Sequence, residues 1–400
     1  MMSCRRGMAM ALTASALALS GAANAADWQF DPSLELGALI ADNYTLANSG
    51  APSADVAGPL LDVSATLRGK SPRTEYLLEP RFRAAHFPDD SELNSESGYF
   101  RFKVDHNGEK SRIGLDAKYA DEFIVDSELL VAGPGNGDLG QGGGPESGHI
   151  TQANRRRLIE ADPYLQFSLN ERTRLRFDAS GMDVSFDTEV FNAQQSYQSL
   201  GISGTLAHDV SPSSALSVTL GTYNFNPDRA GPDVKTNSLL LQWDYRIAER
   251  VRAYFRGGVS RTEGTLGADA VNTPLYGVGA QWTFQRSQLF FDVLRDVAAN
   301  STGFVVASDV VRLWGTHQFT TRLSGFAAIY AVRDESVRSS VLYNPREYVS
   351  ASAGVDWRVF RQVTLSAQYS HAYQDYRHAS SSAYGDTFQA SVVWRPYRVD

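Results

Sequence analysis

Charged side chains that could contact a polar solute recur at every second position in several short stretches of the sequence. Guanidinium groups bind carboxylates and clustered hydroxyl groups through planar, paired hydrogen bonds. Spaced in this way, they could select or bind a charged or hydroxyl-rich solute. The candidates are Glu75, Glu79, Arg81, Arg83, Arg101, Lys103, Arg174, Arg176, Asp244, Arg246, Arg252 and Arg256.

The same charges have a simpler interpretation, in which they only hydrate a water-filled interior and pair with one another across strands. The preference for arginine is also ambiguous, because only five of the 37 basic residues are lysines. A GC-rich genome would produce that preference without any functional cause. Both interpretations stay open at this point.

Catalytic and metal-binding patterns are not found in the chain. The single cysteine, Cys4, lies in the N-terminal leader, and no two of the seven histidines form a metal-binding pair beside a glutamate. The Gly69-Lys70-Ser71 triplet lacks the upstream glycine of a phosphate-binding loop. The "GISG" stretch at 201–204 lacks the spacing of a nucleophile elbow. We therefore predict no enzymatic activity, no cofactor and no metal site.

The glycine-rich stretch Asp121–Gln152 invites a phosphate-binding or calcium-binding interpretation. It contains neither the Gly-Lys-[Ser/Thr] signature nor a repeated calcium-binding pattern. A flexible connection of this composition needs no ligand. We expect it to be a long loop.

The N-terminus predicts a secretory signal peptide over residues 1–25, followed by one domain over residues 26–400. Arg5 and Arg6 precede a short apolar run that ends in the small-residue segment Ala23-Asn24-Ala25. Removal of the two arginines takes the net charge from −8 to −10. An acidic exported chain is a poor candidate for binding nucleic acid.

The rest of the chain alternates apolar and polar residues with a period of two, which predicts β-strands. In the segment 164–180, Leu165, Phe167, Leu175 and Phe177 share one face, while Arg174 and Arg176 lie on the other. Counted in this way, the sequence predicts about 18 strands, with a range of roughly 16–18. Pro80 predicts an irregularity in its strand because proline cannot donate to the sheet.

The connections between these strands alternate between short and long. Short ones include "GKSPR" at 69–73, "LNERT" at 169–173 and "VFRQ" at 359–362, and long ones include 42–58, 121–152 and 370–386. Short turns on one rim and long loops on the other are typical of bacterial outer-membrane barrels. We therefore predict an all-β, antiparallel up-and-down barrel in the outer membrane of a Gram-negative bacterium. Its expected partners are outer-membrane lipid, lipopolysaccharide and the barrel-assembly machinery.

Five of the six tryptophans lie near strand ends that adjoin short turns or the C-terminus, which predicts an aromatic girdle at one membrane interface. Core packing in a soluble β protein is the alternative. The position of Trp314 relative to Val311 and Leu313 implies the opposite face of the sheet. The predicted interface residues are Trp243, Trp282, Trp314, Trp357 and Trp394.

The segment "DWQFDPSLELGALIADNYTLANSG" at 27–50 resembles the opening of outer-membrane β-barrel families encoded with exopolysaccharide and PEP-CTERM loci, the β-barrel porin and EpsL-like proteins. Trp28, Pro32 and the Asp42-Asn43 pair are the matching residues. The resemblance implies an outer-membrane location and a part in exporting or assembling a polysaccharide. A polysaccharide or its export machinery is then an expected partner. The C-terminal "WRPYRVD" departs from the terminal aromatic residue of many barrels.

Together these features favour a porin-like channel associated with exopolysaccharide export or assembly. Two alternatives remain. One is a non-conducting barrel that serves as a structural or docking partner of a secretion system, and the other is a general diffusion porin.

Overall fold

The computed structural model describes residues 27–48, 53–125, 154–189, 194–228, 233–264, 270–300, 303–337, 344–377 and 381–396. The predicted signal peptide and most of the glycine-rich stretch lie outside these ranges. Within them, no helix is long and apolar enough to cross a membrane.

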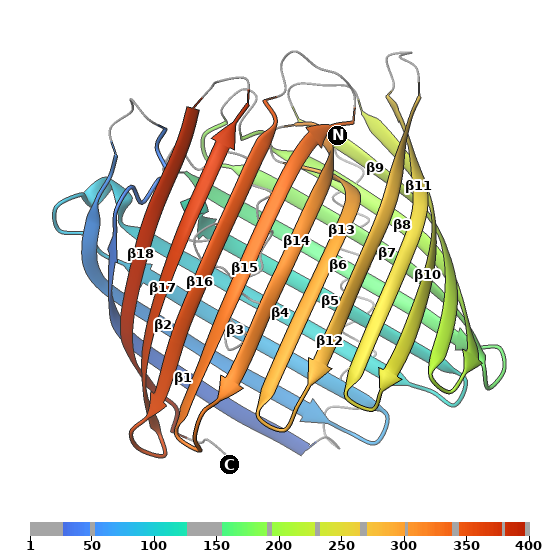
Figure 1. Cartoon of the computed structure of the whole chain (residues 1–400), viewed down its shortest axis with the longest axis horizontal. Coiled ribbons are helices and arrows are strands. Elements are labelled where there is room, and N and C mark those ends of the chain that lie inside the picture. Colours follow the sequence, from blue (N-terminus) through green and yellow to red (C-terminus); the bar gives the residue numbers. More distant parts are fainter. Residues whose placement is uncertain are drawn as a thin grey trace.

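Eighteen antiparallel strands form one closed sheet, which confirms the predicted fold class (Figure 1). Each strand pairs with its neighbours in chain order, and the first strand pairs with the last. The strands are β1 (Asp27–Ala41), β2 (Val56–Lys70), β3 (Thr74–Ala85), β4 (Ser95–Asn107), β5 (Ser111–Phe123), β6 (Arg155–Ser168), β7 (Thr173–Phe186), β8 (Tyr197–Ser211), β9 (Ser214–Pro227), β10 (Val234–Ala248), β11 (Val251–Gly264), β12 (Val271–Thr283), β13 (Ser287–Ala299), β14 (Val305–Gln318), β15 (Leu323–Ser336), β16 (Arg346–Arg358), β17 (Val363–Tyr376) and β18 (Ser381–Trp394).

The predicted alternation of connections is present. Turns of two to four residues join the strands at one rim, which we call the short-turn rim. Connections of four to 31 residues join them at the other, the long-loop rim. The segment 370–386 differs from the prediction, because β17 and β18 extend through most of it and leave only residues 377–380 as a connection.

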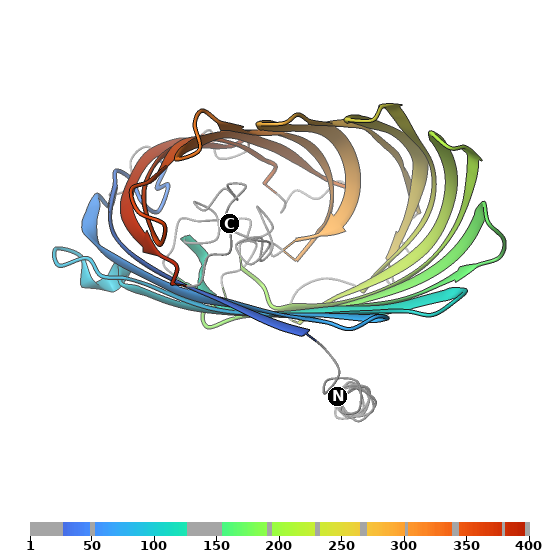
Figure 2. The same cartoon turned by 90° about the horizontal axis from the view of Figure 1, so that it is seen from below.

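The sheet closes around a flattened interior (Figure 2). The seam between β1 and β18 contains eight paired positions, from Leu34 opposite Trp394 to Ala41 opposite Thr387. The pairing of β12 with β13 also contains only eight positions and ends where Tyr276 opposes Arg295. Beyond that point, β13 and β14 stay paired with each other, and their hairpin bends into the interior (Figure 2).

Pro80 interrupts its strand as predicted. The pairing of β2 with β3 passes from Ser64–Arg81 directly to Leu67–Leu78 and omits the two positions between them. The register is the same on both sides of the gap, so the irregularity is a loss of hydrogen bonds and not a bulge. The missing N–H of proline explains the loss.

Alternation along the strands separates an apolar outer face from a charged inner face. On the outer face, large apolar side chains such as Leu36, Leu220 and Leu241 are more than half exposed, at 55%, 62% and 53%. On the inner face, charged residues such as Glu79 and Arg83 are buried. This arrangement is the reverse of a soluble globular protein, in which large apolar side chains lie inside.

Candidate solute path

Every charged residue singled out in the sequence lies on the inner face of the barrel. Sheet register fixes this placement, because each alternates with an outward apolar neighbour and opposes an inward residue of the next strand. The structure therefore brings the predicted residues to one surface. On this surface, the residues fall into two groups: those that form an ion pair with a carboxylate or a cation, and those that do not.

The wall formed by β2 and β3 contains a buried arginine–carboxylate group. Arg81 donates from Nε and Nη2 to both carboxylate oxygens of Asp62, with an Nη2–Oδ2 distance of 2.6 Å. Arg83 Nη1 lies 3.7 Å from Asp62 Oδ2. The three side chains are nearly inaccessible to solvent. A paired fork of this kind fixes both side chains and leaves neither free for a solute.

The next strands extend the same pattern. Arg101 is 2.6 Å from Asp116 and 4.0 Å from Glu79, and Lys103 is 3.6 Å from Asp105. Pairing therefore continues across β3, β4 and β5.

Three further predicted arginines are also paired. Arg174 contacts Asp209 at 2.6 Å, Arg176 contacts Asp178 at 2.6 Å, and Arg256 contacts Asp296 at 3.1 Å. The guanidinium of Arg176 also lies over the ring of Tyr164, 4.2 Å from its centroid. At the short-turn rim, Glu75 is 3.4 Å from Lys70, and both side chains are exposed. For these residues, pairing with a nearby carboxylate describes what the charges do, across strands for most and along β7 for Arg176 and Asp178.

Arg246 and Arg252 differ from all of these. They directly oppose each other on β10 and β11. Within the described ranges, neither forms an ion pair with a carboxylate, and both side chains are exposed. Asp244 lies nearby, where Gln242 donates to its two oxygens at 3.0 and 3.1 Å. Like charges directly opposite each other destabilise a sheet, so this pair is a cost to the fold.

A cavity of about 610 Å³ adjoins this arginine pair on the inner wall at the short-turn rim. Its volume falls within the range of roughly 300–1,000 Å³ that small-molecule sites occupy. It is lined by Arg172, Arg174, Asp209, Ser211, Pro212, Ser213, Ser214, Ala215, Asp244, Tyr245, Arg246, Arg252 and Ala253. Most of these residues belong to the β8–β9 turn and to the strand ends around it.

The long-loop end of the interior contains apolar packing that the sequence did not predict. One cluster joins loop residues such as Leu46 and Phe87 to Val332 and Tyr348 of the opposite wall. A second cluster, defined by Tyr197 and Phe225 with the end of the β13–β14 hairpin, lies over β4–β10. These residues occur in loops and at strand ends, where period-two alternation gives no signal.

Two features anchor these inward loops. Asn43 adopts a φ of +41°, a conformation that asparagine tolerates, and its amide donates to the carbonyls of Ala47 and Tyr384. Ile124 and Val125, where the chain enters the glycine-rich stretch, are fully buried in the two clusters. The described start of that stretch therefore lies inside the barrel and not above it.

The outer face near the short-turn rim carries most of the predicted tryptophans. Trp243, Trp282, Trp357 and Trp394 share the face of the outward apolar residues, and Trp243 donates to the hydroxyl of Ser214 at 2.7 Å. Trp314 was wrongly predicted to belong with them. It lies on the inner face and stacks on Phe290 at 5.7 Å, because its strand position shares parity with inward Arg312 and not with Val311.

Trp28 also lies on the outer face, although it was not among the predicted interface tryptophans. Its ring stacks on Tyr76 at 5.8 Å and covers Gly69. A Cβ at Gly69 would lie 2.6 Å from the indole ring, so glycine is required there for the ring to lie flat on the strand.

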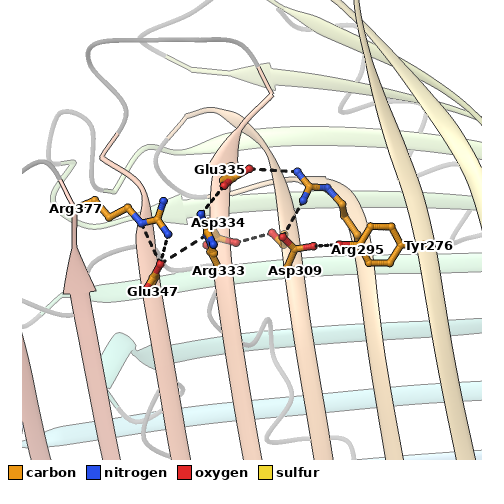
Figure 3. A network of polar contacts seen from close by, with 9 residues as sticks. Tyr276, Arg295, Asp309, Arg333, Asp334, Glu335, Glu347 and Arg377 are labelled. Atoms are coloured by element: carbon orange, nitrogen blue, oxygen red, sulfur yellow. Dashed lines mark hydrogen bonds and ion pairs between the residues drawn. The ribbon is translucent and has the colours of Figure 1, made fainter.

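Near the long-loop rim, the outer face of β12–β17 carries a chain of polar contacts that we call the outer ladder (Figure 3). Its cations are Arg295, Arg333 and Arg377, and each contacts a carboxylate of a neighbouring strand. Distances include 2.8 Å from Arg295 to Asp309, 3.3 Å from Arg295 to Glu335, and 3.7 Å from Arg333 to Glu347. The outer ladder marks where the apolar part of this face ends.

No family model matches the sequence, and no curated protein matches it. Solved structures with a similar overall shape include OccAB4 of Acinetobacter baumannii, at 8% identity and a TM-score of 0.47, covering 92% of this chain and 98% of that one. OpdO of Pseudomonas aeruginosa gives 8% identity, a TM-score of 0.48, and coverage of 92% and 98%. OccK2 (OpdF) of Pseudomonas aeruginosa, in complex with glucuronate, gives 9% identity, a TM-score of 0.46, and coverage of 92% and 99%. At these identities no residue role is transferred to this chain.

The site offers ion pairing and hydrogen bonding as its chemistry. Within the part of the chain that the structure describes, no three His, Cys, Asp or Glu side chains are arranged to hold a metal ion. Guanidinium and hydroxyl groups that face the interior of a barrel can orient or retain a polar solute.

Proposed function

We propose that this chain is a porin-like channel of the Gram-negative outer membrane. The observation that carries the proposal is the division of one closed sheet into an apolar outer face and a charged inner face. In a bilayer every backbone polar group needs an internal partner, and a closed barrel provides one without a free edge. Barrels of about 16–18 strands are wide enough for an aqueous interior.

The height of the apolar outer face supports a membrane location. On β16, Trp357 lies near the short-turn rim and Glu347 of the outer ladder lies ten positions away on the same face. Ten residues span about 34 Å along a strand, at roughly 3.4 Å per residue. A tilt of about 40° reduces this length to roughly 25 Å, the height of the apolar band in outer-membrane barrels.

Neighbouring substitutions on β10 test the membrane location. Leu241 is half exposed on the outer face, and Gln242 lies beside it on the inner face. Leu241→Arg should lower the free energy of unfolding in lipid vesicles by about 2–4 kcal/mol, because the charge would face hydrocarbon. Gln242→Arg, the matched control, places a charge opposite Arg256, which is already paired with Asp296, and should lower it by no more than about 1 kcal/mol. Equal effects of the two would contradict a lipid-facing outer surface.

Conductance tests the channel itself. The folded mature chain should migrate differently on a gel before and after heating, and it should produce stepwise ion currents in planar bilayers. A heat-modifiable barrel that gives no current would refute the channel and leave the membrane location intact.

We further propose an association with exopolysaccharide export or assembly, which rests on the N-terminal resemblance carried by Trp28, Pro32 and Asp42-Asn43. Deletion of the gene in its native host should reduce the amount of extracellular polysaccharide, measured as sugar content of the washed cell surface. Unchanged polysaccharide together with intact conductance would favour a general diffusion porin.

An occluded barrel that acts as a structural or docking partner is a second candidate. The burial of Ile124 and Val125 in the interior clusters favours it, since both residues lead into the glycine-rich stretch. Ile124→Ser combined with Val125→Ser should loosen this packing and raise the single-channel current of an occluded barrel. An unchanged current would show that this packing does not limit the path.

A further inference from the structure

We propose that Arg246 and Arg252, together with Ser211 and Ser213 at the β8–β9 turn, form a binding site for a carboxylated sugar at the short-turn mouth of the barrel. This inference rests on the proposed function, since it names a solute class for the same interior. It begins from the only two predicted arginines to which no carboxylate is paired among the described residues.

The charge balance of the cavity favours an anion. Four arginines line it, Arg172, Arg174, Arg246 and Arg252, and only two carboxylates, Asp209 and Asp244. The lining therefore carries two positive charges in excess. Asp209 is already engaged by Arg174 at 2.6 Å.

Asp244 does not neutralise the pair either. It accepts two hydrogen bonds from Gln242 and makes no ion pair with Arg246 or Arg252. Apart from the Arg174–Asp209 pair, the lining holds Arg172, Arg246, Arg252 and Asp244. Two of its three positive charges are therefore concentrated in the directly opposed guanidinium groups.

The local backbone holds these groups together. Directly opposed residues of antiparallel strands have Cβ atoms about 4.5–5.5 Å apart, so two guanidinium groups can converge on one anion. The register of β10 and β11 shifts between Arg246 and Ala248, immediately beside the pair. A β-bulge of this kind redirects side chains and is common next to functional sites. Without a ligand, the arrangement places like charges together for no structural gain.

Hydroxyl groups complete the site. Ser211 and Ser213 line the cavity beside the arginines. The Ser211 and Ser213 hydroxyls are 3.2 Å apart. The Ser214 hydroxyl instead accepts a hydrogen bond from Trp243 on the outer face at 2.7 Å and takes no part in the site. A hydroxyl both donates and accepts, so Ser211 and Ser213 suit the ring hydroxyls of a sugar, while the planar guanidinium fork suits its carboxylate.

Another arginine of the same rim, Arg358, differs from the pair in having a hydrogen-bond partner in the backbone. Arg358 also lies on the inner face at a short turn, but its guanidinium donates to the backbone carbonyl of Thr321. It provides a matched control, since its replacement removes a charge from the same rim without touching the proposed site.

The test is equilibrium dialysis of the full mature protein in detergent with labelled galacturonate, galactose or inorganic phosphate. Galacturonate should bind, and galactose should bind at least tenfold more weakly. Arg246→Gln or Arg252→Gln should each weaken galacturonate binding about tenfold, equivalent to about 1.4 kcal/mol. Arg358→Gln should leave it unchanged, and galacturonate added at the short-turn side should block the bilayer current of the wild type.

Each outcome discriminates. Galacturonate binding without any current would refute the channel but keep the site. Current without binding, or binding that Arg246→Gln and Arg358→Gln weaken equally, would overturn the site but keep the channel. Equal affinity for phosphate and galacturonate would overturn the role of the serine hydroxyls. A heat-modifiability gel for each variant verifies that the barrel has folded.

Discussion

The arginines of β3 and those of the β10–β11 hairpin face the same interior but have opposite surroundings. Arg81 and Arg83 share the carboxylate of Asp62 in a nearly dry part of the wall. Arg246 and Arg252 face each other, exposed, beside a cavity with an excess of positive charge. The charges of the first region are neutralised within the wall, whereas the two guanidinium groups of the second region remain available to a solute.

This difference separates two interpretations that the sequence left open. Pairing across strands accounts for the first group, because a buried charge is tolerated only with a partner and hydrogen bonds. It does not account for the second group, because the residue directly opposite Arg246 is Arg252, which carries the same charge. A solute path should therefore be sought near the arginines that the fold leaves uncompensated.

The largest expected effect comes from breaking the buried group. Asp62→Asn leaves Arg81 and Arg83 as buried charges without a carboxylate, which should lower the free energy of unfolding by about 3–5 kcal/mol. Urea unfolding in lipid vesicles, followed by gel mobility without heating, measures the loss. Asp244→Asn is the control, because Asp244 is exposed and makes no ion pair, and it should cost less than about 0.5 kcal/mol. Equal losses would remove the distinction between the two regions.

A second substitution converts the uncompensated region into a paired one. Arg252→Glu places a carboxylate opposite Arg246 and should stabilise the barrel by about 0.2–1 kcal/mol. It also removes the excess positive charge of the cavity, so the reversal potential in a salt gradient should move toward cation preference. Arg358→Glu makes the same change of net charge at the same rim. Identical shifts for both variants would mean that the opposed pair has no special role in selectivity.

Much of this comparison is accessible from the sequence. Strand number, the two rims and the inner placement of the charges follow from period-two alternation and turn spacing, which are local properties. Even the bulge beside Arg246 follows in retrospect. A two-residue turn at Glu249-Arg250 without a bulge would set Ile247 opposite Arg252, which would place an apolar and a charged residue on one face.

The remaining features depend on contacts that alternation does not encode. Asp62 directly opposes Arg83, and Arg81 reaches it from a diagonal position through the conformation of its side chain. The interior clusters form from loop residues such as Leu46 and Ile124. The misplacement of Trp314 has a different cause. Trp314 was assigned to the girdle because it lies near a turn. Its position two residues from Arg312 already indicated the inner face.

The smallest expected effect comes from the outer ladder, where the arginine–carboxylate chemistry of Arg81 recurs in a more exposed setting. Arg333 contacts Glu335 at 3.0 Å and Glu347 at 3.7 Å, but its side chain is 47% exposed. Exposed ion pairs contribute about 0.2–1 kcal/mol, so Arg333→Gln should lower the free energy of unfolding by no more than that. In about 1 M salt the screening length falls to roughly 3 Å, and the loss should vanish, whereas that of Asp62→Asn should persist. A loss from Arg333→Gln that equals that of Asp62→Asn, or that survives high salt, would show that burial is not what distinguishes a structural arginine from an available one in this barrel.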